Sequence, residues 1–274
     1  MNNKGLKRFK QNKIAVFGTF IFLFLVIVAL FGPVFCGSPE KIELSDISSP
    51  PSLKHIFGTD DVGRNLFSRA VHGARVSLSV GMVAVAIAIF LGSFYGSISG
   101  FFGGIIDEIM MRFVDVMLAI PTIFLILAVQ VMLKPSIYNV MIIIGLTSWM
   151  GVARMVRGEF LSQKEREYVT AAKARGIGQV SLMFKHILPN AKAPIIVAAS
   201  LGMADAILTE SVLSYLGLGV QPPHASWGNM LENAQAYMLQ AWWMAVIPGL
   251  LILIAVLSLT FIGEGLRDAF DPKL

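Results

Sequence analysis

The sequence predicts an all-α membrane protein with six transmembrane helices. Of 274 residues, 55% are hydrophobic and only 14% are charged, whereas soluble domains carry about 25% charged residues. Long uncharged apolar runs repeat along the chain, and a bilayer core of ~30 Å needs about 20 apolar residues per helix. The predicted spans lie within residues 14–35, 76–102, 113–133, 135–153, 193–218 and 241–262.

The N-terminal segment predicts a first membrane helix that is not cleaved. Basic residues 4–13 precede the apolar stretch 14–35, an order that secretory signal peptides share. The stretch is too long for a signal-peptide core and lacks a small-residue cleavage site, and Phe35 before Cys36 does not suit a lipoprotein signal. Cys36 is the sole cysteine of the sequence, which excludes an internal disulfide and a cysteine-rich metal site.

Lys and Arg are distributed unevenly between the two sides of the predicted spans. If the N-terminus is cytoplasmic, sixteen of them lie on that side, eight of these from Arg154 to Lys192, and six lie on the other side. Cytoplasmic loops of membrane proteins carry the excess of positive charge. We therefore expect both termini in the cytoplasm, and the net charge of +5 reflects topology rather than nucleic-acid binding.

Small residues and prolines mark three of the spans. Gly92, Gly96 and Gly100 recur at four-residue spacing in the second span, a pattern that lets another helix approach backbone to backbone. Pro121 in the third span and Pro248 in the sixth predict kinks, because proline removes a helical hydrogen bond.

The most informative segment is the basic loop REYVTAAKARGIGQVSLMFKHILPN, residues 166–190. It predicts a short helix, a glycine break at residues 176–178, a second short helix and a stop at Pro189. The charge count places this loop in the cytoplasm.

Within this loop, Glu167 and Ala171 share one face of the first short helix, with Ala172 adjacent, and small side chains there give a flat surface for another protein. Gly176 supplies a turn that a Cβ would strain. The segment resembles the EAA loop of ABC-importer permeases, whose coupling helices dock in a cleft of the ATPase subunit. The resemblance implies that the ATPase-coupling residues are Glu167, Ala171, Ala172, Gly176, Ile187 and Pro189.

Further stretches resemble one branch of that family, the second or C-type permease of oligopeptide, dipeptide and nickel importers. They are HILPN at 186–190, HIFGTDDVGR at 55–64, LGLGVQPPHASWGN at 216–229 and GLRDAFDP at 265–272. The chain departs from the family at Asn65, where most members have Asp.

This resemblance implies the fold of a type I ABC importer, in the inner or plasma membrane of a prokaryote. Residues 1–75 would hold the N-terminal tail, first helix and external loop, and residues 76–274 a five-helix core with the coupling loop at 158–192. The implied partners are a second homologous permease, two ATPases, membrane lipid and an external binding lipoprotein. The main interpretation of function is peptide import, and import of nickel or a nickel chelate is the alternative.

Motifs for chemistry within the chain are missing from the sequence. No segment fits the phosphate-binding pattern G-x-x-x-x-G-K-[ST], so we expect partner subunits to bind ATP and Mg²⁺ and to hydrolyse ATP. The four histidines are scattered, and we expect no metal or cofactor in this chain. An intramembrane enzyme would need a catalytic constellation, and a stand-alone secondary transporter would need no ATPase-docking loop.

Three carboxylates fall within predicted spans, where charge is costly and faces a bundle interior or water. Asp115, near a helix start, is expected to be a solvated interfacial charge. Asp205 lies ~18 Å into the fifth span and Glu210 ~25 Å, and they point about 140° apart around the helix. We expect Glu210 to face the translocation pathway and Asp205 to be structural.

Overall fold

The computed structural model describes residues 3–133 and 136–270, which form helices joined by turns and loops. Five helices are long and apolar enough to cross a membrane, and a sixth candidate span is a pair of helices that bends by 80° at its break. By length and composition, the prediction of six spans is confirmed. The long helices are α2 (Lys13–Phe35), α3 (Leu66–Phe102), α6 (Ile137–Lys164), α9 (Lys192–Tyr215) and α11 (Trp243–Phe270). The bent pair is α4 (Gly104–Ala119) and α5 (Thr122–Met132).

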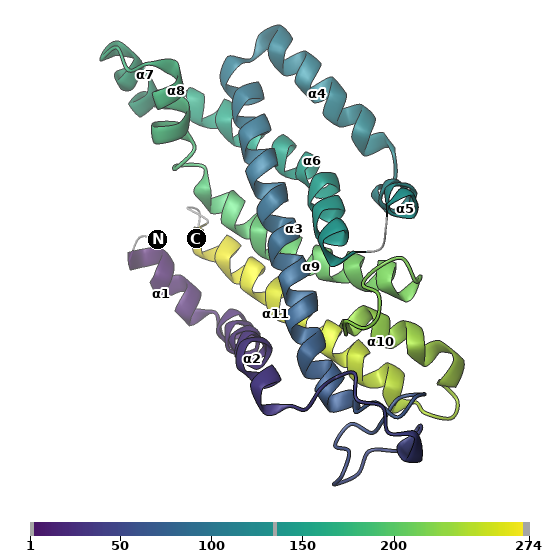
Figure 1. Cartoon of the computed structure of the whole chain (residues 1–274). Helices are drawn as coiled ribbons and strands as arrows, with labels where there is room; N and C mark the ends of the chain where they lie inside the picture. Colours follow the sequence, from purple (N-terminus) through teal and green to yellow (C-terminus); the bar gives the residue numbers. More distant parts are fainter. Residues whose placement is uncertain (1–2, 134–135, 271–274) are drawn as a thin grey trace.

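The remaining elements are short and lie at the two ends of the bundle. They are α1 (Asn3–Gln11), η1 (Leu44–Asp46), α7 (Glu167–Ala174), α8 (Gln179–Ser181), the π-helix η2 (Leu182–Ile187), α10 (Trp227–Ala234) and η3 (Gln235–Tyr237). Figure 1 shows α7 and α8 at one end, and the loop after α2 together with α10 at the opposite end.

Several helices extend beyond the apolar runs that predicted them. α3 begins ten residues before the expected position 76, because the Asn65 side chain accepts hydrogen bonds from the backbone N–H groups of Phe67 and Ser68 and caps the helix. α6 continues past position 153 to Lys164. Charged turns outside the hydrocarbon core remain helical, and hydropathy detects only the apolar part.

Some sequence positions used above lie outside the described residues. They are Lys134, which entered the charge count, Pro135, the expected start of the fourth span, Asp271 and Pro272 of the C-terminal motif, and Lys273, also counted as cytoplasmic.

The third span is broken rather than kinked. Ile120 has an extended backbone, α5 starts directly after Pro121, and α4 and α5 meet at 80°. Proline excludes the preceding residue from the helical region, which explains a stop at this point. By contrast, α11 remains one helix across Pro248.

The helix pair α3–α6 forms the closest contact at the centre of the bundle. A Cβ added to Gly92, Gly96 or Gly100 would lie 2.7, 2.3 or 2.8 Å from a backbone oxygen of α6. The tight approach expected from the glycine spacing is therefore confirmed, and the partner helix is α6.

The side chain of Asn12, the N-cap residue of α2, connects the start of α2 to the end of α11. Asn12 Nδ2 donates a hydrogen bond to Asp268 Oδ2 at 3.3 Å, and a Cβ on Gly265 would lie 2.2 Å from the Ala15 Cβ. The start of α2 and the last turns of α11 therefore lie on the same side of the bundle (Figure 1).

Candidate functional site

The loop between α6 and α9 has the predicted order of two short helices around a glycine turn. α7 ends at Ala174, and Gly176 has a φ of +76°. The Gly176 N–H donates to the Lys173 carbonyl at 2.9 Å, and the Ile177 N–H donates to the Ala172 carbonyl at 3.3 Å. Glycine closes helices in this way because it adopts a positive φ without a steric penalty.

This loop packs on an apolar cluster that it shares with the ends of α3 and α6. Its buried side chains pack against the ends of α3 and α6, and the members of this cluster are Phe101, Val156, Phe160, Val169, Ala172, Leu182, Met183 and Ile187. Lys164 Nζ also donates to the Phe101 carbonyl at 2.8 Å. The loop is therefore held by packing and by this hydrogen bond against the ends of α3 and α6.

The six expected coupling residues divide into two groups. Glu167, Ala171, Gly176 and Pro189 are exposed. Ala172 is 6% exposed and Ile187 is 0% exposed, so neither offers a surface to a partner. Ala172 was expected on the flat surface beside Ala171, and this expectation is wrong. Successive residues of a helix point about 100° apart, and this rotation directs Ala172 into the apolar cluster beneath the loop.

One exposed apolar residue of the loop was missed by the sequence analysis. Val180, at the start of the second short helix, is 68% exposed. Its neighbours Leu182 and Met183 are buried, so the break in the apolar run at Ser181 was the available signal.

Two ion pairs tie α4 to α6 near this end of the bundle. Arg157 Nε donates to Asp107 Oδ1 at 3.0 Å, and the Ser99 hydroxyl donates to the same carboxylate oxygen. Arg154 Nη2 donates to Asp115 Oδ1 at 2.6 Å, and both of these side chains are about half exposed. The exposure of Asp115 agrees with the expected solvated charge, and the structure adds its ion pair with Arg154.

Glu210 is fully buried, which contradicts its expected place on the pathway. Its Oε2 accepts a hydrogen bond from the Ser77 hydroxyl at 3.2 Å, and its Oε1 accepts one from the Ser214 hydroxyl at 2.7 Å. Those hydroxyls in turn accept from the backbone N–H groups of Trp227 (3.2 Å) and Val220 (3.0 Å). The carboxylate thus joins α9 to α3 and to the segment before α10.

Asp205 has the opposite environment. Its side chain is exposed on α9 and forms no hydrogen bond or ion pair with any residue that the structure describes. The Thr209 hydroxyl donates only to the Asp205 backbone carbonyl, at 2.8 Å. The environments of the two acids are therefore the reverse of those expected: Glu210 has the contacts of a structural residue, and Asp205 does not.

The motif at residues 55–64 forms a compact loop at the far end of the bundle. Asp60 is 1% exposed and accepts from the Arg64 backbone N–H at 2.8 Å and from Arg64 Nε at 2.6 Å. Lys54 and then His55 hydrogen-bond to Asp46 and lower its pKa to about 2. Asn65 caps α3.

One group of side chains in this loop has the spacing of metal ligands. Glu43, Asp46 and His55 each offer one ligand atom, and these atoms lie within 4.8 Å of one another. Both carboxylates are already paired with ammonium groups, Glu43 with Lys41 at 2.7 Å and Asp46 with Lys54. A cation would have to displace both lysines, so this donor set does not favour a metal.

Two family models and several relatives match the sequence of this chain. The family model "Binding-protein-dependent transport system inner membrane component" matches residues 84–274, and "N-terminal TM domain of oligopeptide transport permease C" matches residues 4–51. The dipeptide transport system permease protein DppC of Alkalihalophilus pseudofirmus is 42% identical over 99% of this chain and 90% of its own length. The oligopeptide transport system permease protein OppC of Bacillus subtilis is 41% identical over 98% of this chain and 89% of its own length. The chain belongs to the family of binding-protein-dependent transport system inner membrane components.

Proposed function

We propose that this chain is a permease subunit of an ATP-driven importer that takes up peptides. The observation that carries the proposal is the exposed loop α7–α8–η2, which packs through an apolar cluster on the ends of α3 and α6. The names of the relatives support peptides over nickel as the solute, because they are dipeptide and oligopeptide permeases.

The proposed partners are those that the family resemblance implies. A second homologous permease completes the pathway, two ATPases bind ATP and Mg²⁺, and an external binding lipoprotein delivers the peptide. Glu167, Ala171, Gly176 and Pro189 would meet the ATPase, with Val180 as an apolar contact beside them. Ala172 and Ile187 would act indirectly, by holding the shape of the loop.

The docking surface can be tested by a matched pair of substitutions in α7. Ala171→Glu adds a bulky charge to the exposed face, whereas Thr170→Glu changes a neighbouring exposed residue that points about 100° away. We expect Ala171→Glu to abolish co-purification of the ATPase and peptide uptake, and Thr170→Glu to retain both. ATP-independent peptide uptake by the purified chain would instead favour a secondary transporter and refute the proposal.

The proposed orientation places both termini and the coupling loop in the cytoplasm. It is supported by the positive-charge excess on that side. In a Cys36→Ser background, a cysteine at Ser45 should react with an impermeant thiol reagent on whole cells, and one at Ser162 should react only after lysis. Both positions lie outside the apolar runs of the spans. The reverse labelling pattern would contradict this orientation.

We also assign Asp205, rather than Glu210, to the translocation pathway. An exposed carboxylate near the middle of a span is costly against lipid, so its face must meet water or another subunit. Asp205 shares that face of α9 with Leu201, Leu208 and Val212, all of them exposed. This face would line the pathway between the two permeases.

A further inference from the structure

The helix α4 is joined to its neighbours at both ends by breaks in the helical backbone (Figure 1). Gly103 and Gly104, at its start, have φ angles of +67° and +56°, and a Cβ added to Gly104 would meet no other part of the chain within 4 Å. At its end, Ile120 is extended and α5 leaves at 80°. Glycines in open space can change their backbone angles without a steric penalty. α4 is therefore a rigid segment between two points at which the chain can bend.

The face of α4 that meets the bundle is held mainly by polar contacts. Its buried residues are Asp107 and Val114. Asp107 Oδ1 accepts a hydrogen bond from Arg157 Nε at 3.0 Å, and the Tyr95 hydroxyl donates to the Met110 carbonyl at 3.0 Å. The contact of α4 with the bundle thus differs from that of α3 with α6, which pack backbone to backbone.

A polar groove lies between α4 and α6 beside these contacts. Its volume is about 270 Å³, which is room for several water molecules. The ion pair of Asp115 with Arg154 is about half exposed beside it. Water competes for the charges of such exposed pairs, so they contribute little to stability and separate at a small cost. The charged residues that line the groove are Asp107, Glu108, Arg112, Asp115 and Arg157.

The two arginines that hold α4 belong to the part of α6 that supports the coupling loop. Val156, which lies between Arg154 and Arg157 in sequence, is a member of the apolar cluster beneath that loop. Phe101 of α3 belongs to the same cluster and comes two residues before Gly103. α4 is therefore connected to the base of the coupling loop twice, through its ion pairs with α6 and through the turn that follows α3.

We propose that α4 is a hinged arm, which its two ion pairs hold against α6 and which separates from α6 when the ATPases act on the coupling loop. The inference rests on the proposed function, in which ATPases dock on that loop. A displacement of the end of α6 would draw both arginines away from their carboxylates. α4 would then turn about Gly103, Gly104 and Ile120, because hinge motions are absorbed by a few residues at the ends of elements. The turn would also move α5, the other half of the same broken span.

A fixed α4 accounts for fewer of these observations. Permanent contacts between membrane helices are built from small residues that pack closely, as between α3 and α6. α4 instead buries one apolar side chain, Val114, and relies on ion pairs beside a polar groove. Two consecutive glycines with positive φ in open space would add nothing to a rigid joint.

The first test uses a cysteine beneath the arm. Val114→Cys in a Cys36→Ser background is studied in the importer assembled in proteoliposomes with its ATPases, second permease and binding protein. Val114 is 0% exposed, so its cysteine should react slowly with a small water-soluble thiol reagent without nucleotide, and faster during ATP hydrolysis. Val80→Cys, equally buried but on α3, should react slowly under both conditions.

The second test weakens the ion pairs. Without nucleotide, Asp107→Asn and Asp115→Asn should each raise the reaction rate of Val114→Cys by about fivefold, the effect of one partly exposed charge pair. Glu108→Gln, an exposed acid of the same groove, should leave that rate unchanged. Asp107→Asn combined with Val80→Cys should also show no increase, whereas a general loosening of the bundle would raise the rate for Val80→Cys too.

The third test prevents the movement. Asp115→Cys and Arg154→Cys together, in the Cys36→Ser background, place one thiol on each side of the groove, and both positions are half exposed. A bis-maleimide that links the two thiols should abolish uptake of alanine peptides of two, three and five residues. A monofunctional maleimide, which modifies the same thiols without joining α4 to α6, should allow uptake.

The outcomes separate the arm from the function on which it rests. If the wild-type importer takes up none of the alanine peptides, the proposed peptide function fails. If it takes them up while Val114→Cys stays equally slow to react during ATP hydrolysis, the arm alone is refuted. Normal uptake by the cross-linked importer would refute it as well.

Discussion

Glu210 provides the sharpest test of how the bundle is held together. Each of its oxygens accepts one serine hydroxyl, from Ser77 at 3.2 Å and from Ser214 at 2.7 Å. In Glu210→Gln, one oxygen becomes an NH₂ group, so one buried hydroxyl loses its acceptor. A buried donor without an acceptor costs about 1–3 kcal/mol. Glu210→Leu removes both acceptors, so its cost should be about twice as large.

The assay is thermal unfolding of the assembled complex in detergent. A loss of about 2 kcal/mol corresponds to a fall of about 4–8 °C in Tm for a chain of this size. Glu210→Gln should therefore melt earlier and Glu210→Leu earlier still, while Asp205→Asn, on the exposed face of the same helix, stays near the wild-type Tm. A wild-type Tm for both Glu210 variants, combined with reduced uptake, would refute the structural role.

Two glycine substitutions test the loop and the helix contact. Gly176→Leu places a side chain at a φ of +76°, which costs about 1–3 kcal/mol, so co-purification of the ATPase should fall while membrane insertion persists. The control Gly178→Leu, at a φ of −62°, should co-purify normally with the ATPase. Equal yields of the ATPase with both variants would contradict the turn assignment. Gly96→Leu would bring a Cβ to 2.3 Å from the Ala153 carbonyl, and overpacking costs about 1–3 kcal/mol or more. Its Tm should fall by several degrees, whereas Gly151→Leu, with no atom within 4 Å, should not melt earlier.

Local patterns in the sequence were sufficient for the membrane class and for the loop. Apolar runs predicted six spans, because the bilayer sets the length of every spanning helix. The break at Gly176 was predicted because a positive φ strongly favours glycine. The spacing of Gly92, Gly96 and Gly100 predicted a close helix contact, although not the identity of its partner, α6.

The tertiary structure decided which groups are buried and which are free. Glu210 and Asp205 are both acids in one helix, and their environments differ because serines from α3 and α9 surround only Glu210. Likewise, Ala172 is buried in a cluster that also contains residues of α3, α6 and η2.

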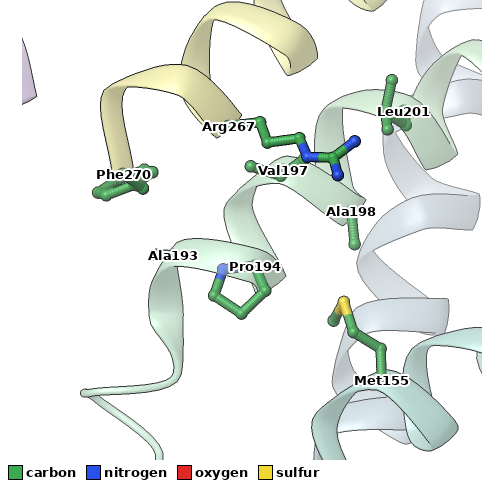
Figure 2. Close-up of a pocket in the computed structure, with 8 residues that line it drawn as sticks. All are labelled: Met155, Ala193, Pro194, Val197, Ala198, Leu201, Arg267 and Phe270. Carbon is green, nitrogen blue, oxygen red and sulfur yellow. The ribbon is translucent and has the colours of Figure 1, made fainter. Parts of the chain in front are cut away.

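An open groove beside the start of α9 depends on three helices at once (Figure 2). Its lining comes from α6, α9 and α11, and no local pattern indicates that Arg267 lies beside Leu201. Periodicity within one helix predicts which residues share a face. What covers that face depends on the packing of helices that are far apart in the chain. For this reason the sequence alone did not indicate that Glu210 is buried and Asp205 exposed.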